Sequence, residues 1–249
     1  MHKIKLDAID TRAPGHIDKK KALNQLEDLL AELDDLQNLL YAGSAHAVLV
    51  VLQGMDASGK DGLIRNVFGQ LNPEGVQVAS FKQPTAKELA HDFLWRVHLH
   101  APERGHIRIF NRSHYEDILV TRVHHECNDE LAKKRMKAIN DFESLLKEHN
   151  HTEVLKFYLH TSRAERHKRL EERLTIPSKM WKYSNSDLKE AKFWPEYERY
   201  YEDCFNHCNK IPWIIVPSDQ NWYKDLVVAQ ALRDTLRNLK MKYPRLKKS

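Results

Sequence analysis

The spacing of apolar residues divides the chain into short strands and longer helices. A continuous apolar run at residues 47–52 is typical of a strand that is buried on both faces of a parallel sheet. Similar runs predict four further strands, at residues 76–79, 107–110, 154–159 and 213–216. Apolar positions three and four residues apart lie between the runs and predict helices. This alternation indicates an α/β fold with a mainly parallel five-stranded sheet flanked by helices.

The same spacing locates the helices. Leu23, Leu26, Leu30 and Leu33 belong to an amphipathic helix that ends near Gly43, and we expect it to pack on its own domain rather than form a coiled coil. Other helices are expected through residues 63–71, 89–100 and 226–239, with two more before residue 148. We interpret residues 1–249 as one domain, with an N-terminal helical extension at 15–43 and a basic lid at 163–190.

Composition narrows the class of protein. The 40 Lys and Arg residues exceed the 35 Asp and Glu residues by five, and a net charge of +5 is too small by itself to indicate a nucleic acid partner. The longest apolar run is far short of the roughly 18 residues of a membrane span, and the first residues lack an apolar signal core. The three cysteines contain no Cys-x-x-Cys pair, so we expect free thiols and a cytoplasmic location, without membrane or nucleic acid partners.

A phosphate-binding loop follows the first predicted strand. Residues 54–60, Gly-Met-Asp-Ala-Ser-Gly-Lys, fit the pattern G-x-x-x-x-G-K between a buried strand and a helix. The glycines allow backbone amides to surround phosphate oxygens, while the helix N-terminus and Lys60 add positive charge. We therefore expect phosphate contacts from Gly54, Ala57, Ser58, Gly59 and Lys60.

Two aspartates distinguish this loop from a nucleotide-binding P-loop. Asp61 stands where Ser or Thr normally coordinates Mg²⁺, and Asp56 lies inside the loop. A carboxylate that faces phosphates is unfavourable unless a cation lies between them. Asp56 therefore indicates direct Mg²⁺ coordination. For Asp61, a metal role and a favourable interaction with the helix dipole are both open.

A second motif, Phe-Asn-Arg-Ser-His-Tyr-Glu-Asp at residues 110–117, ends the third predicted strand. Ligands bind at the carboxyl ends of strands in open α/β sheets, so Arg112 is expected to contact phosphates, with a helix ion pair as the alternative. Glu116 and Asp117 are candidates to hold a metal or cap a helix, and capping is favoured for Asp117. Arg122, farther along the same helix, either reaches phosphate or has a structural role.

Basic residues also follow the second and fourth strands. Lys82 ends the second strand and is expected near an anionic ligand. In the lid region, basic residues at helical spacing indicate either a track for a polyanion or a solvated, salt-bridged helix. The residues of this proposed track are Arg169, Arg173, Lys179 and Lys182, preceded by Arg163 and Arg166. A mobile lid would exclude water from a phosphoryl transfer, which requires positive charge, metal and alignment more than covalent chemistry.

Three motifs together resemble the family-2 polyphosphate kinases: residues 54–62, residues 110–117 and the Trp-Lys-Tyr-Ser sequence at 181–184. The resemblance implies a thymidylate-kinase-like P-loop kinase fold. It also implies transfer of phosphoryl groups between inorganic polyphosphate and nucleoside mono- and diphosphates, with Mg²⁺ as cofactor and Mn²⁺ as a substitute. Adenine nucleotides are the expected acceptors, guanine nucleotides are a second option, and a homodimer or homotetramer is expected.

The resemblance also assigns roles to residues of this sequence. Asp56, Lys60 and Arg112 match the family's catalytic residues, with Asp56 as the metal ligand, and Arg173 matches a lid arginine. Asn111 stands where some members have a metal-binding Asp, which indicates a subgroup that accepts AMP, and we favour the one that accepts both AMP and ADP. Nucleotide contacts are assigned to Asn111, Glu116, Asp117 and Glu126.

Two other functions use the same loop. One is an ordinary nucleotide kinase with ATP as donor, and the other is a non-catalytic P-loop protein that binds a polyanion. Asp61 in place of Ser or Thr, together with the arginine-rich lid, favours polyphosphate as donor.

Overall fold

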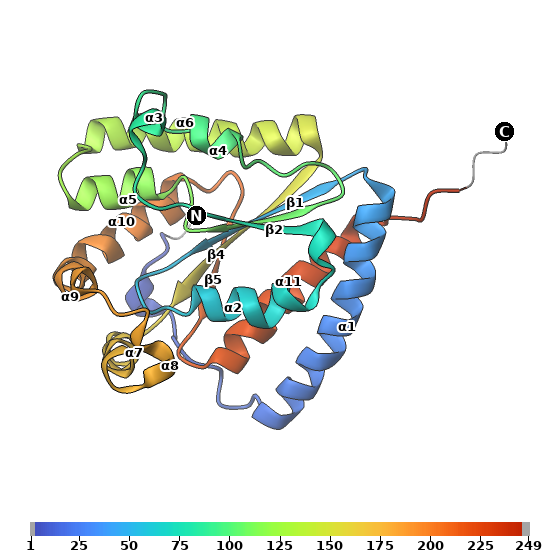
Figure 1. The fold of residues 1–249 in the computed structure, drawn as a ribbon, viewed down its shortest axis with the longest axis horizontal. Helices are drawn as coiled ribbons and strands as arrows, with labels where there is room; N and C mark the ends of the chain where they lie inside the picture. The colour runs from blue at the N-terminus through green and yellow to red at the C-terminus, as the bar shows by residue number, and fades with distance from the viewer. Residues whose placement is uncertain (1–2, 246–249) are drawn as a thin grey trace.

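The computed structural model describes residues 3–245, apart from two side chains in one short helix. All the strand pairs of its five-stranded sheet are parallel, in the order β2-β3-β1-β4-β5 (Figure 1). The strands are β1 (Ala47–Gln53), β2 (Val76–Ser80), β3 (Ile107–Asn111), β4 (Thr152–His160) and β5 (Trp213–Pro217). The predicted α/β fold with a parallel five-stranded sheet is confirmed.

Strand β1 lies at the centre of the sheet and is buried along its whole length. Its side chains alternate between two apolar cores, with Val48 and Val50 on one face and Leu49 and Val51 on the other. Because both faces are covered, the strand contains a continuous apolar run rather than an alternating one.

Helices cover both faces of the sheet (Figure 1). The core around Val48 and Val50 includes α1 (Lys19–Gly43), α2 (Lys60–Val67) and α11 (Asn221–Asn238). The core around Leu49 and Val51 includes α5 (Glu116–Val123), α6 (Asp129–Asn150) and α10 (Trp194–His207). Between β4 and α10, the chain forms α7 (Arg163–Thr175), α8 (Pro177–Met180) and α9 (Asn185–Glu190). Four 3₁₀ turns complete the fold: η1 (Leu6–Ala8), η2 (Phe68–Gln70), η3 (Pro73–Gly75) and η4 (Ala191–Phe193).

The helix expected at residues 89–100 is instead two single turns, α3 (Ala86–Leu89) and α4 (Trp95–His98). Thr85 forms a capping box with Glu88, which starts the first turn earlier than expected. The Asp92 carboxylate accepts a hydrogen bond from the Leu94 amide at 2.9 Å. Such a local bond competes with helical hydrogen bonding, so the chain bends between the two turns.

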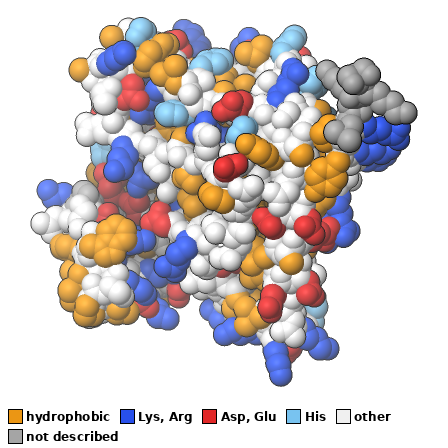
Figure 2. All heavy atoms as spheres, turned by 45° about the vertical axis from the view of Figure 1, so that its right-hand side comes forward, with side chains coloured by type: hydrophobic (Ala, Val, Ile, Leu, Met, Phe, Trp, Pro, Cys, Tyr) orange, Lys and Arg blue, Asp and Glu red, His pale blue; other side chains and the backbone are white. Residues whose placement is uncertain are grey.

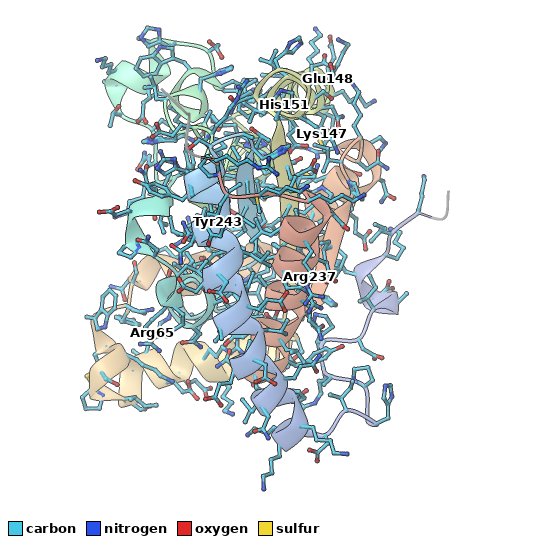
Figure 3. All side chains as sticks on the ribbon, turned by 90° about the vertical axis from the view of Figure 1, so that its right-hand side faces the viewer. Arg65, Lys147, Glu148, His151, Arg237 and Tyr243 are labelled. Carbon is cyan, nitrogen blue, oxygen red and sulfur yellow. The ribbon has the colours of Figure 1, made fainter. Side chains whose placement is uncertain are left out.

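The N-terminal helix α1 packs along α11, as its apolar spacing predicts (Figure 3). Leu33 and Leu40 are fully buried in the core that also holds β1. At the edge of this contact, Glu32 accepts hydrogen bonds from Arg233 and Arg237 of α11. Helix α1 is therefore part of the apolar core of the sheet.

One face of the molecule is mixed in charge (Figure 2). On the face drawn in Figure 2, Lys and Arg are scattered among Asp and Glu rather than clustered in one basic patch.

Among residues 3–245, no helix is both long and apolar enough to cross a membrane. The three cysteines are buried and free.

Leu33→Ala is expected to lower the free energy of unfolding by about 2–5 kcal/mol, because it leaves a cavity in a closed core. Leu23→Ala, on the same helix but 43% exposed, should change it by no more than about 0.5 kcal/mol. Urea denaturation followed by circular dichroism measures both. Equal losses for the two variants would contradict the packing of α1 described here.

Candidate functional site

The phosphate loop connects the end of β1 to the start of α2. Gln53 ends the strand, Lys60 begins the helix, and Ala57 and Gly59 have left-handed backbone angles, with φ of 61° and 95°. The Ser58 amide donates to the Met55 carbonyl at 3.1 Å, which closes the turn. The loop therefore curls at the carboxyl edge of the central strand, where ligands bind in open α/β sheets.

Lys60 is buried beneath this turn. Its Nζ donates to the carbonyl oxygens of Gly54 at 2.7 Å and Met55 at 3.2 Å. Burial lowers the pKa of Lys60 to about 8, and repulsion from Arg112 adds to this effect. The ammonium is therefore held in place within the loop and loses its proton in mildly alkaline solution.

Arg112 lies opposite the loop aspartate. It follows β3, adopts a left-handed φ of 61°, and donates from Nη2 to Asp56 Oδ1 at 2.8 Å. Burial alone would lower the pKa of Arg112, but Glu116 and Asp56 outweigh it and raise the pKa above the ordinary arginine value. Asp56 and Arg112 thus form an ion pair at the opening of the loop.

A cavity of about 350 Å³ opens beside this pair. We call it the loop cavity. It combines carboxylates with aromatic rings, and burial raises the pKa of both Glu116 and Asp187 in its wall. Its lining consists of Gly54, Met55, Asp56, Gln83, Arg112, Glu116, Val120, Asp187, Glu190, Trp194, Tyr197 and Tyr201.

Buried polar contacts hold the second motif against the loop. Gln53 donates to Ser113 Oγ at 2.9 Å and accepts from the Tyr201 hydroxyl at 3.0 Å. Behind them, the fully buried Glu143 accepts from Lys156 at 2.8 Å and from the Tyr115 hydroxyl at 2.8 Å. Ser113 and Tyr115, which follow Arg112 in the chain, are therefore tied to the sheet and to α6 and α10.

Asp61 links the loop to the helical segment α7–α9. It accepts hydrogen bonds from Lys182 Nζ at 2.8 Å and from the side-chain amide of Asn111 at 3.1 Å. Burial alone would raise the pKa of Asp61, but these two hydrogen bonds outweigh it and the pKa is lowered. Asp61 also lies in the first turn of α2, where a negative charge is favourable.

The arginines of α7 lie at helical spacing but have different partners. Arg163 and Arg166 both donate to Glu198 at 2.8 Å, and Arg166 is only 2% exposed. Arg173 pairs with Asp187 at the loop cavity. Lys179 pairs with Glu172 at 2.6 Å. Each of these cations therefore has a carboxylate partner on the protein.

Arg169 contacts the backbone of the loop rather than facing an open track. Its Nη1 donates to the carbonyls of Ala57 and Ser58, both at 3.1 Å, and its Nη2 donates to the carbonyl of Ser218 at 2.8 Å and that of Asp219 at 3.1 Å. In this arrangement it joins α7, the phosphate loop and the segment after β5.

The predicted site residues that do not line the loop cavity include Arg122, Asp117, Lys82 and Glu126. For Arg122, the expectation of a phosphate contact is corrected in favour of the structural role. Its side chain donates to Asp129 at 2.7 Å and to Asp203 at 3.0 Å and stacks on Tyr200, facing α6 and α10. Asp117 does not cap α5 but pairs with Arg96 at 3.1 Å. Lys82 and Glu126 are exposed, the first after β2 and the second after α5.

Sequence reasoning missed the aromatic wall of the loop cavity and the lysine beneath Gly59. Trp194, Tyr197 and Tyr201 lie three and four residues apart on α10, a spacing that signals one face of a helix but not what it faces. Lys224, only 1% exposed, donates to the Gly59 carbonyl at 3.2 Å. Its position in a predominantly apolar stretch of α11 was the available signal.

The arrangement suits Mg²⁺ bound jointly by protein and substrate. Within the described part of the chain, no group of three or more His, Cys, Asp or Glu side chains is placed to hold a metal ion. Mg²⁺ commonly uses one or two carboxylates together with substrate phosphates and water. Asp56, whose side chain is 25% exposed at the loop, fits such a site with phosphate oxygens as the other ligands.

Comparisons with known proteins agree with this geometry. Residues 16–244 match the family model described as polyphosphate kinase 2. The chain is 47% identical over 228 residues to an AMP/ADP-polyphosphate phosphotransferase of Meiothermus ruber, which covers 91% of this chain and 85% of that protein. It is 41% identical over 257 residues to an ADP-polyphosphate phosphotransferase of Rhodopseudomonas palustris, which covers 97% of this chain and 89% of that protein.

A solved structure is also similar. The crystal structure of polyphosphate kinase 2 from Arthrobacter aurescens superimposes with a TM-score of 0.94 at 38% sequence identity. The superposition covers 99% of this chain and 89% of that one. On the match to the family model and the identity to these relatives, the chain belongs to the polyphosphate kinase 2 family.

Proposed function

We propose that this protein is a phosphotransferase that moves phosphoryl groups between inorganic polyphosphate and the nucleotides AMP and ADP. The observation that carries the proposal is the ion pair of Asp56 and Arg112 over the buried Lys60, at the carboxyl edge of β1. It supplies positive charge and a metal-binding carboxylate at one point, which is what phosphoryl transfer requires. The names of the relatives from Meiothermus ruber and Rhodopseudomonas palustris support the choice of substrates.

In the proposed reaction, the loop amides and Lys60 bind the end of the polyphosphate chain. A terminal phosphate oxygen of the acceptor forms a bond to the transferred phosphorus. The bond to the bridging oxygen breaks, and its electron pair stays with the shortened polyphosphate. Arg112 neutralises charge on the transferred group, and Asp56 would hold a Mg²⁺ ion whose charge supplements it.

The acceptor nucleotide suits the loop cavity. Trp194, Tyr197 and Tyr201 offer aromatic surface to a base, and Glu116 and Glu190 offer acceptors for hydroxyl and amino groups. Arg112 lies in the same wall, so an acceptor bound there would present its phosphate to the loop. Asn111 and the similarity to the Meiothermus ruber relative favour both AMP and ADP as acceptors.

Residues 163–190 are proposed to act as a lid. Lys182 reaches Asp61, and Arg173 reaches Asp187 in the wall of the loop cavity. Polyphosphate oxygens would replace these carboxylates as partners of the lid cations, which makes Arg173, Lys179 and Lys182 the proposed donor track.

The buried free thiols favour a cytoplasmic location, where cysteines are kept reduced. Assembly as a homodimer or homotetramer remains a prediction.

The choice of donor is tested by incubating ADP with Mg²⁺ and either polyphosphate or GTP as sole donor. We expect ATP to form rapidly from polyphosphate, and formation only from the nucleoside triphosphate would overturn the proposal. Lys60→Met should lower the polyphosphate rate by at least about 100-fold, because the proposal places its charge beside the phosphates held by the loop. Arg65→Met, an exposed cation on the same helix, is the control and should change the rate little (Figure 3).

The rate is expected to depend on pH through Lys60. Its pKa of about 8 means that the ammonium is charged below this pH and neutral above it. The kcat/KM for polyphosphate, which reports the free enzyme, should therefore fall as pH rises through about 8. Bound phosphate stabilises the charged form, so kcat should persist to higher pH. A kcat/KM that stays flat to pH 10 would contradict this role of Lys60.

The two loop aspartates are expected to differ in their effect on metal use. Asp56→Asn should raise the Mg²⁺ concentration for half-maximal rate by about tenfold or more, because it removes the proposed protein ligand. Asp61→Asn breaks contacts to Lys182 and Asn111, so it should alter the KM for polyphosphate and leave the Mg²⁺ dependence unchanged. Mg²⁺ titrations of initial rates compare them, and the reverse pattern would reassign the metal to Asp61.

A further inference from the structure

The carbonyl oxygens of the phosphate loop are bound by three cations from three different helices. Lys60 of α2 binds those of Gly54 and Met55, Arg169 of α7 binds those of Ala57 and Ser58, and Lys224 of α11 binds that of Gly59. We call Lys60, Arg169 and Lys224 the loop cations. Together these three side chains donate to five carbonyl oxygens of the loop, those of Gly54, Met55, Ala57, Ser58 and Gly59.

Lys224 contributes to this set from the segment after β5. Its Nζ lies 3.2 Å from the Gly59 carbonyl oxygen and 3.0 Å from Asn221 Oδ1. A Cβ atom added to Gly59 would lie 2.9 Å from this Nζ and 3.4 Å from Arg169 Nη1. Gly59 therefore gives Lys224 and Arg169 close access to the loop, in addition to adopting a φ of 95°.

The position of Lys224 is unfavourable for stability. The side chain is 1% exposed, it lies in the first turns of α11, and the nearest oxygen of its carboxylate neighbour Asp225 is 3.6 Å away. Burial lowers the pKa of Lys224, the neighbouring Asp225 carboxylate offsets part of this effect, and repulsion from Arg169 adds to it. A positive charge near a helix N-terminus also meets the positive end of the helix dipole. Departures of this kind are expected where function requires them.

The contacts with loop carbonyls indicate how the charge of Lys224 favours phosphate binding. A carbonyl held by a cation on the outer side of the turn leaves the neighbouring N–H groups free to point toward a phosphate on the inner side. Such fixed dipoles stabilise an anion without reorganisation when it binds. Lys224 acts at Gly59, the last residue before α2, whose carbonyl also accepts the first hydrogen bond of the helix from the Leu63 amide at 3.0 Å. Lys224 therefore adds a second, charged partner to this carbonyl, at the point where the loop amides join the helix N-terminus.

We propose that Lys224 is a positioning residue for phosphate binding, which holds the Gly59 carbonyl outward so that the end of the loop presents its amides to the polyphosphate donor. The inference rests on the proposed function only for the identity of the donor. It assigns to α11 a part in substrate binding, separate from its packing against α1.

The test compares Lys224→Met with Lys224→Gln and with Arg233→Met. The Gln variant keeps a hydrogen-bond donor without the charge, and the Arg233 variant removes one positive charge from the same helix away from the loop. Lys224→Met should raise the KM for polyphosphate about tenfold, the loss of one charge-assisted hydrogen bond, and change the KM for ADP less than about twofold. Lys224→Gln should fall between it and the wild type, and Arg233→Met should match the wild type.

Two further measurements separate positioning from general stability. Lys224→Met leaves the buried Asp225 carboxylate without the cation beside it, so its melting temperature should fall; Asp225→Asn, which removes the other member of the same pair, is the matched stability control. Calorimetric titration with tripolyphosphate, without nucleotide, should show the same tenfold loss of affinity. An unchanged affinity of Lys224→Met for tripolyphosphate, or an equal loss of affinity in Asp225→Asn, would overturn the inference.

The same titration distinguishes this inference from the proposed function. If the wild type binds tripolyphosphate but does not use polyphosphate as donor, the proposed function fails, and weaker binding by Lys224→Met still supports positioning. If the wild type uses polyphosphate and Lys224→Met keeps the wild-type KM, the inference fails and the proposed function stands.

Discussion

The central position of β1 determines where the functional groups of this protein meet. Because β1 is buried on both faces and lies between β3 and β4, the loop that follows it must emerge at the middle of the carboxyl edge. The segment after β3 then brings Arg112 to one side of the loop, and the segment after β4 brings α7 to the other. All of these segments leave parallel strands at the same edge, so residues far apart in the sequence meet at one point.

Charge at that edge is balanced within the protein. Asp56 pairs with Arg112, Asp61 with Lys182 and Asp187 with Arg173, while the loop cations bind backbone carbonyls. In the proposed function, phosphate oxygens take the place of the carboxylate on each of these cations. The carbonyl contacts of Lys60 are buried and those of Arg169 and Lys224 are partly buried, and all of them bind backbone groups of the loop. The cations paired with carboxylates are those proposed to bind a polyanion, Arg169 and Lys224 hold the turn, and Lys60 is proposed to do both.

The second motif depends on a buried support that does not itself face the loop cavity. Arg112 has a left-handed backbone, which is costly for a residue with a side chain. Ser113 is bound by Gln53 and the neighbouring Tyr115 by Glu143, which also pairs with the fully buried Lys156. Removing one partner of such a buried pair would leave an uncompensated charge, so this network is tightly constrained. Its constraint keeps the Arg112 backbone in a conformation that it would otherwise rarely adopt.

The sequence by itself determined the five strands and the phosphate loop, and it indicated that Asp56, Lys60 and Arg112 lie at the carboxyl ends of strands, because each of these features depends on local spacing or on adjacent residues. It did not determine that Arg122 faces α6 and α10, that Arg169 and Lys224 bind loop carbonyls, or that α10 supplies the aromatic wall of the loop cavity. Successive side chains on a helix point about 100° apart, so the direction of each arginine depends on how its helix packs against the rest of the protein. Only the packing of elements far apart in the chain decided which cations reach the loop and which pair elsewhere.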